Sequence, residues 1–299
     1  MDGKGRSAQA LAATPTLDGR RAIVTGAAAG LGRSFALAIA AAGATVSGCD
    51  VDPAIEGLGT ELGRRAGLLT VADVADPAAV DAFVDAAAER MGGIDLVVNN
   101  AAIVRQTSPL TDSLEKAIAD FDAIIGVNLR GPFLVGRAAI PHLARQGGDI
   151  VNISTDHVHT CGYPLEVDHE EGSVCRWVGV RRPPLGGPRY DLYDSSKWAL
   201  KGLTLTWAAA LAEHGVRVNS LGMGTTDTPL IRAHLAAKGE ATRPGMLEPE
   251  RVAAVLVDLI AEGPAGRSGD SIQLWPGHPC RLPPVGLDGR LFAATYFLS

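Results

Sequence analysis

The chain has 299 residues, of which 46% are hydrophobic, enough for one or two domains with a full core. Its formal net charge of −6 argues against a general nucleic-acid-binding protein, and no apolar run approaches the roughly 18 residues of a membrane span. The four cysteines are scattered without a CxxC pair, which indicates reduced thiols in a cytoplasmic protein.

From residue 17 onward, short strand-like runs alternate with helical patterns. This alternation predicts one α/β domain over residues 17–278, a doubly wound parallel sheet (Rossmann fold) with helices on both faces. We expect a flexible tail at residues 1–16, and a C-terminal tail at 279–299 that covers the core or contacts another subunit. The predicted strands are 22–25, 44–50, 68–71, 96–98, 149–154, 216–219 and 271–274, and the predicted helices are 34–42, 78–91, 114–145, 195–213 and 250–262.

The first chemical motif is the glycine-rich run Thr25–Gly32, between the first predicted strand and the first predicted helix. Gly26 permits a tight turn, Gly30 lets a pyrophosphate approach the backbone, and Gly32 lets helix and strand pack closely. The free N–H groups and the positive end of the helix would then face the phosphates. Glycine turns without a ligand are common, so the motif needs support from elsewhere in the chain.

Asp50 supplies that support at the end of the second predicted strand. It follows Gly26 at close to the roughly 20-residue spacing at which a carboxylate binds the adenosine ribose hydroxyls. A carboxylate there repels a 2′-phosphate and favours NAD over NADP. Alternatively, Asp50 is a turn residue or helix cap ahead of Pro53, and Asp52 takes the ribose role if the strand register shifts.

Residues 156–189 fall outside the alternation, because they are polar, rich in proline and glycine, and without periodicity. Long irregular inserts are often lids or binding loops, so we expect this one to cover the substrate pocket. His157, His159 and Cys161 alternate, and an extended backbone would point all three to one side as in a zinc site. Their spacing matches no familiar ligand pattern, and a solvated loop is the alternative, so we expect no metal.

Tyr193 and Lys197 lie on one face of a predicted helix in the run YDSSK. A free phenol has a pKa of about 10, and a nearby cation lowers it by favouring phenolate. The pattern YxxxK occurs often by chance, and a surface Tyr/Lys pair is the alternative. Its place after the fifth strand, behind a nucleotide-binding loop, favours a catalytic pair.

With these motifs in place, the chain resembles the short-chain dehydrogenase/reductase family over about residues 17–277. Each matching motif alone is weak, whereas the set is highly specific. The resemblance implies hydride transfer to or from a nicotinamide coenzyme without a metal, and dimers or tetramers. The matching motifs are Thr25–Gly32, Asp73–Val74, Asn99–Ala102, Asn128, Asn152–Thr155, Tyr193 with Lys197, and Arg217–Ser220.

The resemblance also implies roles for individual residues. Tyr193 would exchange a proton with the substrate oxygen, Lys197 would lower the pKa of Tyr193 and hold the ribose, and Asn128 would hold a relay water. Thr155 would orient the substrate oxygen, with Ser154 as the alternative. The implied NAD contacts are Gly26, Gly30, Leu31, Gly32, Asp50, Asp73, Val74, Asn100, Ala101, Lys197, Thr226 and Thr228.

Three features depart from the family pattern. Thr155 stands where a second serine is usual, and its methyl group crowds the pocket. Met223 replaces the proline of a Pro-Gly turn, which we expect to loosen the loop over the nicotinamide. The insert 156–189 separates the fifth strand from Tyr193 more than is usual. The loop 225–247 is expected to close over the ligand.

The leading hypothesis is an NAD-dependent dehydrogenase that interconverts a small secondary alcohol and a ketone, as a homodimer or homotetramer. An NADPH-dependent biosynthetic ketoreductase is the alternative, against which Asp50 counts. A non-catalytic nucleotide-binding scaffold is the third hypothesis, which the changes at Thr155 and Met223 leave open. No part of the sequence identifies the substrate.

Overall fold

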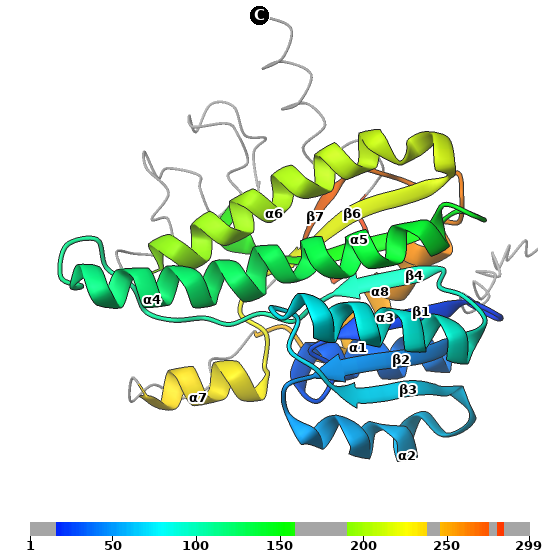
Figure 1. Ribbon diagram of the computed structural model, residues 1–299, viewed down its shortest axis with the longest axis horizontal. Helices are drawn as coiled ribbons and strands as arrows, with labels where there is room; N and C mark the ends of the chain where they lie inside the picture. Colours follow the sequence, from blue (N-terminus) through cyan, green and yellow to red (C-terminus); the bar gives the residue numbers. More distant parts are fainter. Residues whose placement is uncertain (1–15, 159–189, 238–245, 275–279, 284–299) are drawn as a thin grey trace, which may run out of the picture.

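The computed structural model describes residues 16–158, 190–237, 246–274 and 280–283, in which seven parallel strands form one sheet (Figure 1). The strand order is β3-β2-β1-β4-β5-β6-β7, which confirms the doubly wound fold expected from the sequence. The insert follows the fifth strand as predicted, but residues 159–189 lie outside the described part of the chain. The strands are β1 Arg21–Thr25, β2 Thr45–Asp50, β3 Ala66–Val71, β4 Leu96–Asn99, β5 Gly148–Thr155, β6 Val216–Met223 and β7 Ser271–Leu274.

Helices cover both faces of this sheet, and each face has its own apolar core (Figure 1). Alternate residues of β1 point to opposite faces, so Val24 joins the core under α1 and α8 while Ile23 joins the core under α3 and α5. Every residue of β4 and β6 is buried, as expected for strands covered on both sides. The helices are α1 Gly30–Ala41, α2 Leu58–Leu62, α3 Pro77–Met91, α4 Leu114–Ile125, α5 Gly131–Leu143, α6 Asp191–Ala210, α7 Pro229–Ala237 and α8 Pro249–Ala261.

The long helix predicted at 114–145 is two α-helices, α4 and α5, joined by a π-helical turn at Gly126–Arg130. The turn carries Asn128, and π-turns inside helices are frequent at functional sites. The hydrophobic period hardly changes across such a turn, so the pattern predicted one uninterrupted helix.

The segment predicted as a loop at 225–247 contains the helix α7. The helix begins at Pro229, and proline is favoured in the first turn of a helix because the N–H group that it lacks would have no helical partner there. Met223 is the last residue of β6 and pairs with Thr155 of β5 and Leu274 of β7. The backbone at Met223 is therefore held by the sheet on both sides.

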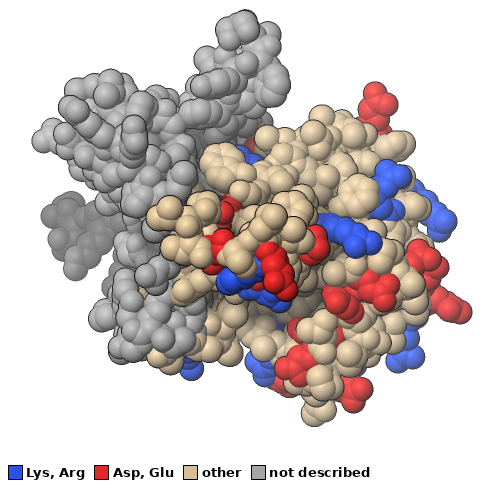
Figure 2. Space-filling model, turned by 60° about the vertical axis from the view of Figure 1, so that its left-hand side comes forward, with Lys and Arg blue, Asp and Glu red and all other residues tan. Residues whose placement is uncertain are grey.

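The continuous segment Leu114–Leu143 is long and apolar enough to cross a membrane by length and composition alone. That is weak evidence for a span, because α5 packs against α3 and β4 as part of the core. Acidic and basic side chains are mixed over the part of the molecular face in Figure 2 that the described residues form, and these residues make no continuous basic surface there.

Candidate active site

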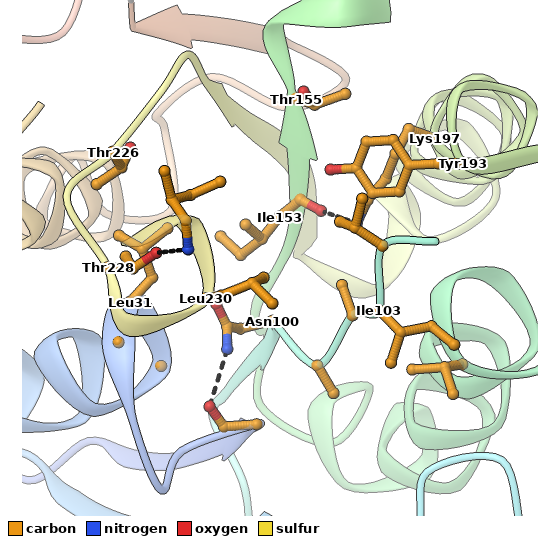
Figure 3. A pocket seen from close by; sticks show the side chains of 18 of the residues that line it. Leu31, Asn100, Ile103, Ile153, Thr155, Tyr193, Lys197, Thr226, Thr228 and Leu230 are labelled. Carbon is orange, nitrogen blue, oxygen red and sulfur yellow. Dashed lines mark hydrogen bonds between the residues drawn. The ribbon is translucent and has the colours of Figure 1, made fainter. Parts of the chain in front are cut away.

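A cavity of about 1200 Å³ opens at the carboxyl edge of the sheet, where β1, β2, β4, β5 and β6 end (Figure 3). Ligands of doubly wound folds bind at this edge, next to the point where the strand order reverses. Every residue predicted to bind coenzyme or act in catalysis lines the cavity except Asn128 and the alternative ribose-binding residue Asp52. The fold thus brings predicted site residues that are spread along the sequence between Gly26 and Thr228 into one cavity.

The glycine-rich loop connects β1 to α1 in a close turn. Gly26 has a φ of +66°, and a Cβ atom there would lie 2.8 Å from the Ala101 Cα atom. A Cβ atom on Gly32 would lie 1.9 Å from the Gly26 carbonyl oxygen, so only glycine allows helix and strand to approach this closely. No side chain caps α1 and no acidic residue lies in its first turn, which leaves its first N–H groups available for an anion.

Asn100 and Thr25 hold this loop against the end of β4. The Thr25 hydroxyl accepts hydrogen bonds from the backbone N–H groups of Asn100 and Ala101, both at 3.1 Å. The Asn100 amide donates to the carbonyl oxygens of Thr25 and Gly26, both at 3.0 Å. Asn100 therefore positions the loop through its side chain as well as lining the cavity.

Two carboxylates line the cavity at the ends of β2 and β3. Asp50 accepts hydrogen bonds from the backbone N–H groups of Ala28 and Asp52, both at 3.0 Å. Asp73 accepts one from Ala75 at 2.8 Å, and Val74 lies beside it on the cavity wall. The other predicted candidate, Asp52, caps the short helix at 53–57 and does not line the cavity.

Tyr193 and Lys197 project from the first turns of α6 (Figure 3). Lys197 is only 3% exposed, donates a hydrogen bond to the Ile153 carbonyl oxygen at 2.9 Å, and has its Nζ 5.9 Å from the centre of the Tyr193 ring. Burial lowers the pKa of Lys197 to about 8. The ammonium thus sits below the phenol ring, as the YxxxK spacing predicted.

The pKa of Tyr193 is raised to about 12, and burial is the largest cause. A hydrogen bond with Thr155 lowers this pKa, while the carboxylates of Asp194 and Asp156 raise it further. Tyr193 is therefore a protonated phenol at neutral pH and can donate its proton to an oxygen in the cavity. Its use as a base requires additional positive charge nearby.

Two adjacent hydroxyls at the end of β5 differ in their surroundings. Thr155 forms a hydrogen bond with Tyr193 and lies 3.4 Å from a carboxylate oxygen of Asp156. The Ser154 hydroxyl is buried and has no hydrogen-bond partner among the described residues. Successive strand residues point to opposite sides of the sheet, so only one of the two hydroxyls can face Tyr193. The hydrogen bond favours Thr155 for that position.

Asn128 is fully buried behind the cavity wall. Its side-chain oxygen accepts from the Ile103 N–H at 2.8 Å, and its amide donates to the Ile103 carbonyl oxygen at 3.0 Å and to the Ser196 hydroxyl at 3.2 Å. Ser196 in turn donates to the Tyr193 carbonyl oxygen at 2.6 Å. Asn128 thus joins the loop after β4 to the turn of α6 that carries Tyr193.

Sequence reasoning missed the pairing of His157 with Asp194. His157 lines the cavity two residues after Thr155, and its Nδ1 lies 2.8 Å from a carboxylate oxygen of Asp194. The two residues are far apart in the sequence, although an aspartate directly after Tyr193 was a visible signal. His159 and Cys161, which we considered with His157 for zinc, lie outside the described residues, and the described part of the chain holds no metal-binding group.

Comparison with known proteins agrees with this geometry. Residues 20–163 match the short chain dehydrogenase family, and residues 181–274 match the enoyl-(acyl carrier protein) reductase family. The chain is 31% identical over 258 residues to a 3-oxoacyl-(acyl-carrier-protein) reductase from Thermotoga maritima, which covers 82% of this chain and 92% of that protein. It is 33% identical over 234 residues to galactitol 2-dehydrogenase from Agrobacterium fabrum, with 77% and 80% covered.

Solved structures give the same result. A short-chain type dehydrogenase/reductase from Mycobacterium marinum superposes with a TM-score of 0.71 at 30% identity, covering 89% of this chain and 98% of that one. A 3-ketoacyl-(acyl-carrier-protein) reductase from Brucella melitensis, complexed with NADH, superposes with a TM-score of 0.70 at 28% identity, covering 88% and 99%. Relatedness over nearly the full domain establishes that the chain belongs to the short-chain dehydrogenase/reductase family of oxidoreductases.

Proposed function

We propose that the protein transfers a hydride between NAD and a small secondary alcohol or ketone, with Tyr193 as the acid and base. One observation carries this proposal: Tyr193, Lys197 and Thr155 line the same cavity as the glycine-rich loop. A phenol beside a buried ammonium is suited to proton transfer, whereas a protein that only binds a nucleotide does not need this pair.

The described cavity fits a dinucleotide, because glycines leave its floor open and the uncapped start of α1 offers N–H donors for a pyrophosphate. When bound, the coenzyme supplies or accepts the hydride at its nicotinamide C4 atom, so the protein has only a proton to transfer. We propose as coenzyme-binding residues Gly26, Gly30, Leu31, Gly32, Asp50, Asp73, Val74, Asn100, Ala101, Lys197, Thr226 and Thr228.

We propose NAD rather than NADP because of the charges at the adenosine end. Asp50 and Asp73 both line the cavity there, and a 2′-phosphate would be repelled by them. Arg33, the basic residue next to the glycine-rich loop, is paired with Glu61. A carboxylate such as Asp50 suits the two free ribose hydroxyls of NAD as a hydrogen-bond acceptor.

In the proposed mechanism, Tyr193 donates its proton to the ketone oxygen in reduction and takes the proton from the alcohol in oxidation. Lys197 stabilises the phenolate through its charge, and the Thr155 hydroxyl binds the substrate oxygen, with Ser154 as the alternative. We further propose that Asn128 holds a water molecule in a proton relay to Lys197. Substrate reaches these groups beside α7, whose residues Leu230, Ile231 and Leu235 line the cavity.

A second candidate function is that of an NADPH-dependent ketoreductase in a biosynthetic pathway. The relative from Thermotoga maritima named as a 3-oxoacyl reductase favours it, while Asp50 counts against it. The third candidate, a non-catalytic scaffold, is disfavoured because Tyr193 and Lys197 are both present in the cavity, with the Thr155 hydroxyl in place of the usual serine hydroxyl. The coenzyme titration below separates the first two candidates.

We propose that the protein forms a homodimer or homotetramer through the outer side of α4. Leu114, Ile118 and Phe121 lie on that side at helical spacing and are exposed by 76%, 53% and 50%. The free thiols of Cys49 and Cys280 are consistent with a cytoplasmic location. We also propose a single catalytic domain at 17–278 with tails at 1–16 and 279–299, and the insert 156–189 as a substrate lid.

The test is a titration of the purified protein with NADH and separately with NADPH, followed by coenzyme fluorescence. We expect micromolar binding of NADH and binding of NADPH that is at least about tenfold weaker. Asp50→Asn removes the negative charge at the adenosine end of the cavity and should reduce the difference in affinity between NADH and NADPH. Asp52→Asn is the matched control, because Asp52 lies outside the cavity, and it should leave both affinities unchanged. Tighter binding of NADPH than of NADH would contradict the proposed coenzyme.

A further inference from the structure

Thr155 and Met223 lie side by side at the carboxyl ends of β5 and β6, and both line the cavity. We propose that the Thr155 methyl group and the Met223 side chain form an apolar wall that determines which substrates fit. A ketone substrate then has one unbranched carbon next to its carbonyl group, on the side that faces this wall. The inference rests on the proposed function and narrows its substrate class.

The register of the sheet places these two side chains next to each other on one face. Thr155 follows Ile153 by two residues and so points to the same face, where Ile153 belongs to the core under α1 and α8. The same holds for Met223, which follows Leu221 by two residues. Thr155 and Met223 are direct partners in the β5–β6 ladder, in which neighbouring strands lie about 4.8 Å apart. The two side chains therefore adjoin where the core ends and the cavity begins.

The hydrogen bond with Tyr193 fixes the direction of the Thr155 methyl group (Figure 3). The hydroxyl and the methyl group of threonine are attached to the same Cβ atom, so orienting one orients the other. A substrate oxygen that is bound by the Thr155 and Tyr193 hydroxyls therefore places one neighbour of its carbonyl carbon against the methyl group. The other neighbour points away from β6, into the rest of the cavity.

Met223 extends the wall and cannot move aside with its backbone. That backbone is paired with Thr155 on one side and with Leu274 on the other, and the next N–H, that of Gly224, donates to the Leu274 carbonyl oxygen at 2.9 Å. The Met223 side chain is 7% exposed and packs in the core under α1 and α8. A branched substituent on this side would have to displace that side chain from its packing, which costs binding free energy.

The chemistry of the wall selects an apolar substituent as well as a small one. A methyl group forms no conventional hydrogen bond, and the thioether of Met223 is only a weak acceptor. A hydroxyl or charged group placed against them would lose its water without a replacement partner. The substituent that faces Thr155 and Met223 is therefore a methyl group or a ring CH₂ group.

The experiment compares 2,2-dimethylcyclohexanone, which has one unbranched carbon beside its carbonyl group, with 2,2,6,6-tetramethylcyclohexanone, which has none. Dissociation constants are measured by ligand-observed NMR on the protein saturated with NAD⁺, which cannot reduce a ketone, so no turnover is needed. We expect the dimethyl ketone to bind at least about thirtyfold more tightly. Thr155→Ser, which keeps the hydroxyl, and Met223→Ala should each reduce this ratio by about threefold, and the double variant by about tenfold. Met91→Ala, a methionine of α3 outside the cavity, is the matched control and should leave the ratio unchanged.

Equal binding of the two ketones to the wild type would overturn the proposal. Variants of Thr155 and Met223 that change the affinity for both ketones by the same factor would also overturn it, because that result indicates a merely structural role. Binding of NAD⁺ without binding of either ketone would contradict the proposed function itself, and the wall with it. Failure of NAD⁺ to bind would contradict the proposed coenzyme, and the same ratios would then be measured with NADP⁺. Failure of the proposed function and failure of the wall are thereby distinguishable.

Discussion

The amino edge of the sheet buries the cations Arg217 and Arg267, the carboxyl edge buries Lys197, and the surroundings of these cations differ between the two edges. At the amino edge, Arg217 of β6 forms an ion pair with Asp149 at 2.6 Å and donates to the carbonyl oxygens of Leu259 and Ile260. At the carboxyl edge, Lys197 is equally buried but forms no ion pair within the described part of the chain. Its ammonium group donates a hydrogen bond to a neutral acceptor, the carbonyl oxygen of Ile153.

The amino edge is arranged for stability. Asp149 is held between Arg217 and Arg20, which lies 2.5 Å from it, and Asp95 pairs with Arg21 at 2.8 Å. Burial raises the pKa of Asp149, and both arginines oppose that shift. A buried charge with its partners in place costs little, whereas the same charge left alone is strongly destabilising.

The carboxyl edge carries groups that an arrangement for stability alone would avoid. Lys197 has no carboxylate partner there, and the Ser154 hydroxyl is buried without a hydrogen bond among the described residues. Groups of this kind are typical of active sites, where stability is given up for chemistry. Burial alone therefore does not mark a functional cation, whereas Lys197 is distinguished from Arg217 by being buried without a carboxylate partner among the described residues.

The largest expected effect is at Tyr193. Tyr193→Phe removes the hydroxyl that we propose as the proton donor to the ketone oxygen, and should lower kcat by about a thousandfold or more. The affinity for NADH should stay within about twofold, because the phenol is not needed for coenzyme binding. Steady-state kinetics and a fluorescence titration measure the two quantities. Turnover close to that of the wild type would show that the proton donor is elsewhere.

At the amino edge, Arg217→Met should destabilise the fold by about 3–5 kcal/mol, because it leaves Asp149 buried with only Arg20 as partner. The pKa of Asp149, already raised, should rise further. A carboxyl with a raised pKa in the folded state loses stability as the pH rises, so the deficit should be smaller in acid than at neutral pH. Urea unfolding at several pH values measures the free energy of unfolding of the variant and of the wild type. A loss below about 1 kcal/mol at neutral pH would mean that the Arg217–Asp149 ion pair is not the main stabilising contact at the amino edge.

The third effect separates the two hydroxyls of β5. Thr155→Val keeps the shape of the side chain but removes the hydroxyl that bonds to Tyr193, and should lower kcat/KM by about a hundredfold. Ser154→Ala is the matched control, with an expected change of less than about threefold. If Ser154→Ala has the larger effect, the orienting role belongs to Ser154 instead.

The smallest effect has the opposite sign. Burial lowers the pKa of Lys197 from its ordinary 10.5 to about 8, which corresponds to about 3 kcal/mol of lost stability when the ammonium is charged. Lys197→Met should therefore stabilise the fold by about 2 kcal/mol at neutral pH, after subtracting about 1 kcal/mol for the hydrogen bond to Ile153.

The pH dependence of that gain provides its own check. The cost of the buried ammonium is fully present below the folded-state pKa of about 8 and falls as the pH rises toward 10.5. The stability gain of Lys197→Met should disappear over the same range, while activity is lost at every pH. A variant that loses both stability and activity at neutral pH would contradict the contrast between the two edges.

Much of the fold followed from local pattern, because strand and helix periods and the glycine-rich loop are set by neighbouring residues. The π-turn at Asn128 was missed since one extra residue barely changes a helical pattern. The helix α7, which begins at Pro229, was missed because proline is found both in loops and in the first turns of helices. Both misses lie at the cavity, where the local structure departs most from regular elements.

In the candidate site, spacing identified the Tyr193–Lys197 pair and the carboxylate at Asp50, because each is tied to a regular element. The partner of His157 could not be read from spacing, since Asp194 reaches it only after β5 and α6 have packed side by side. The second role of Asn100 could not be predicted from spacing either. Asn100 was predicted to contact the coenzyme, and in the structure its amide also donates hydrogen bonds to the carbonyl oxygens of the glycine-rich loop.

The most direct test of the central claim, that the carboxyl edge is an NAD-dependent active site, is to follow the hydride itself. NADH carrying deuterium at both C4 positions is incubated with cyclohexanone, and the product is examined for deuterium on the carbon that bears the new hydroxyl. We predict label transfer by the wild type and none above background by Tyr193→Phe. Tight binding of NADH without label transfer would contradict the proposed activity and favour a nucleotide-binding scaffold.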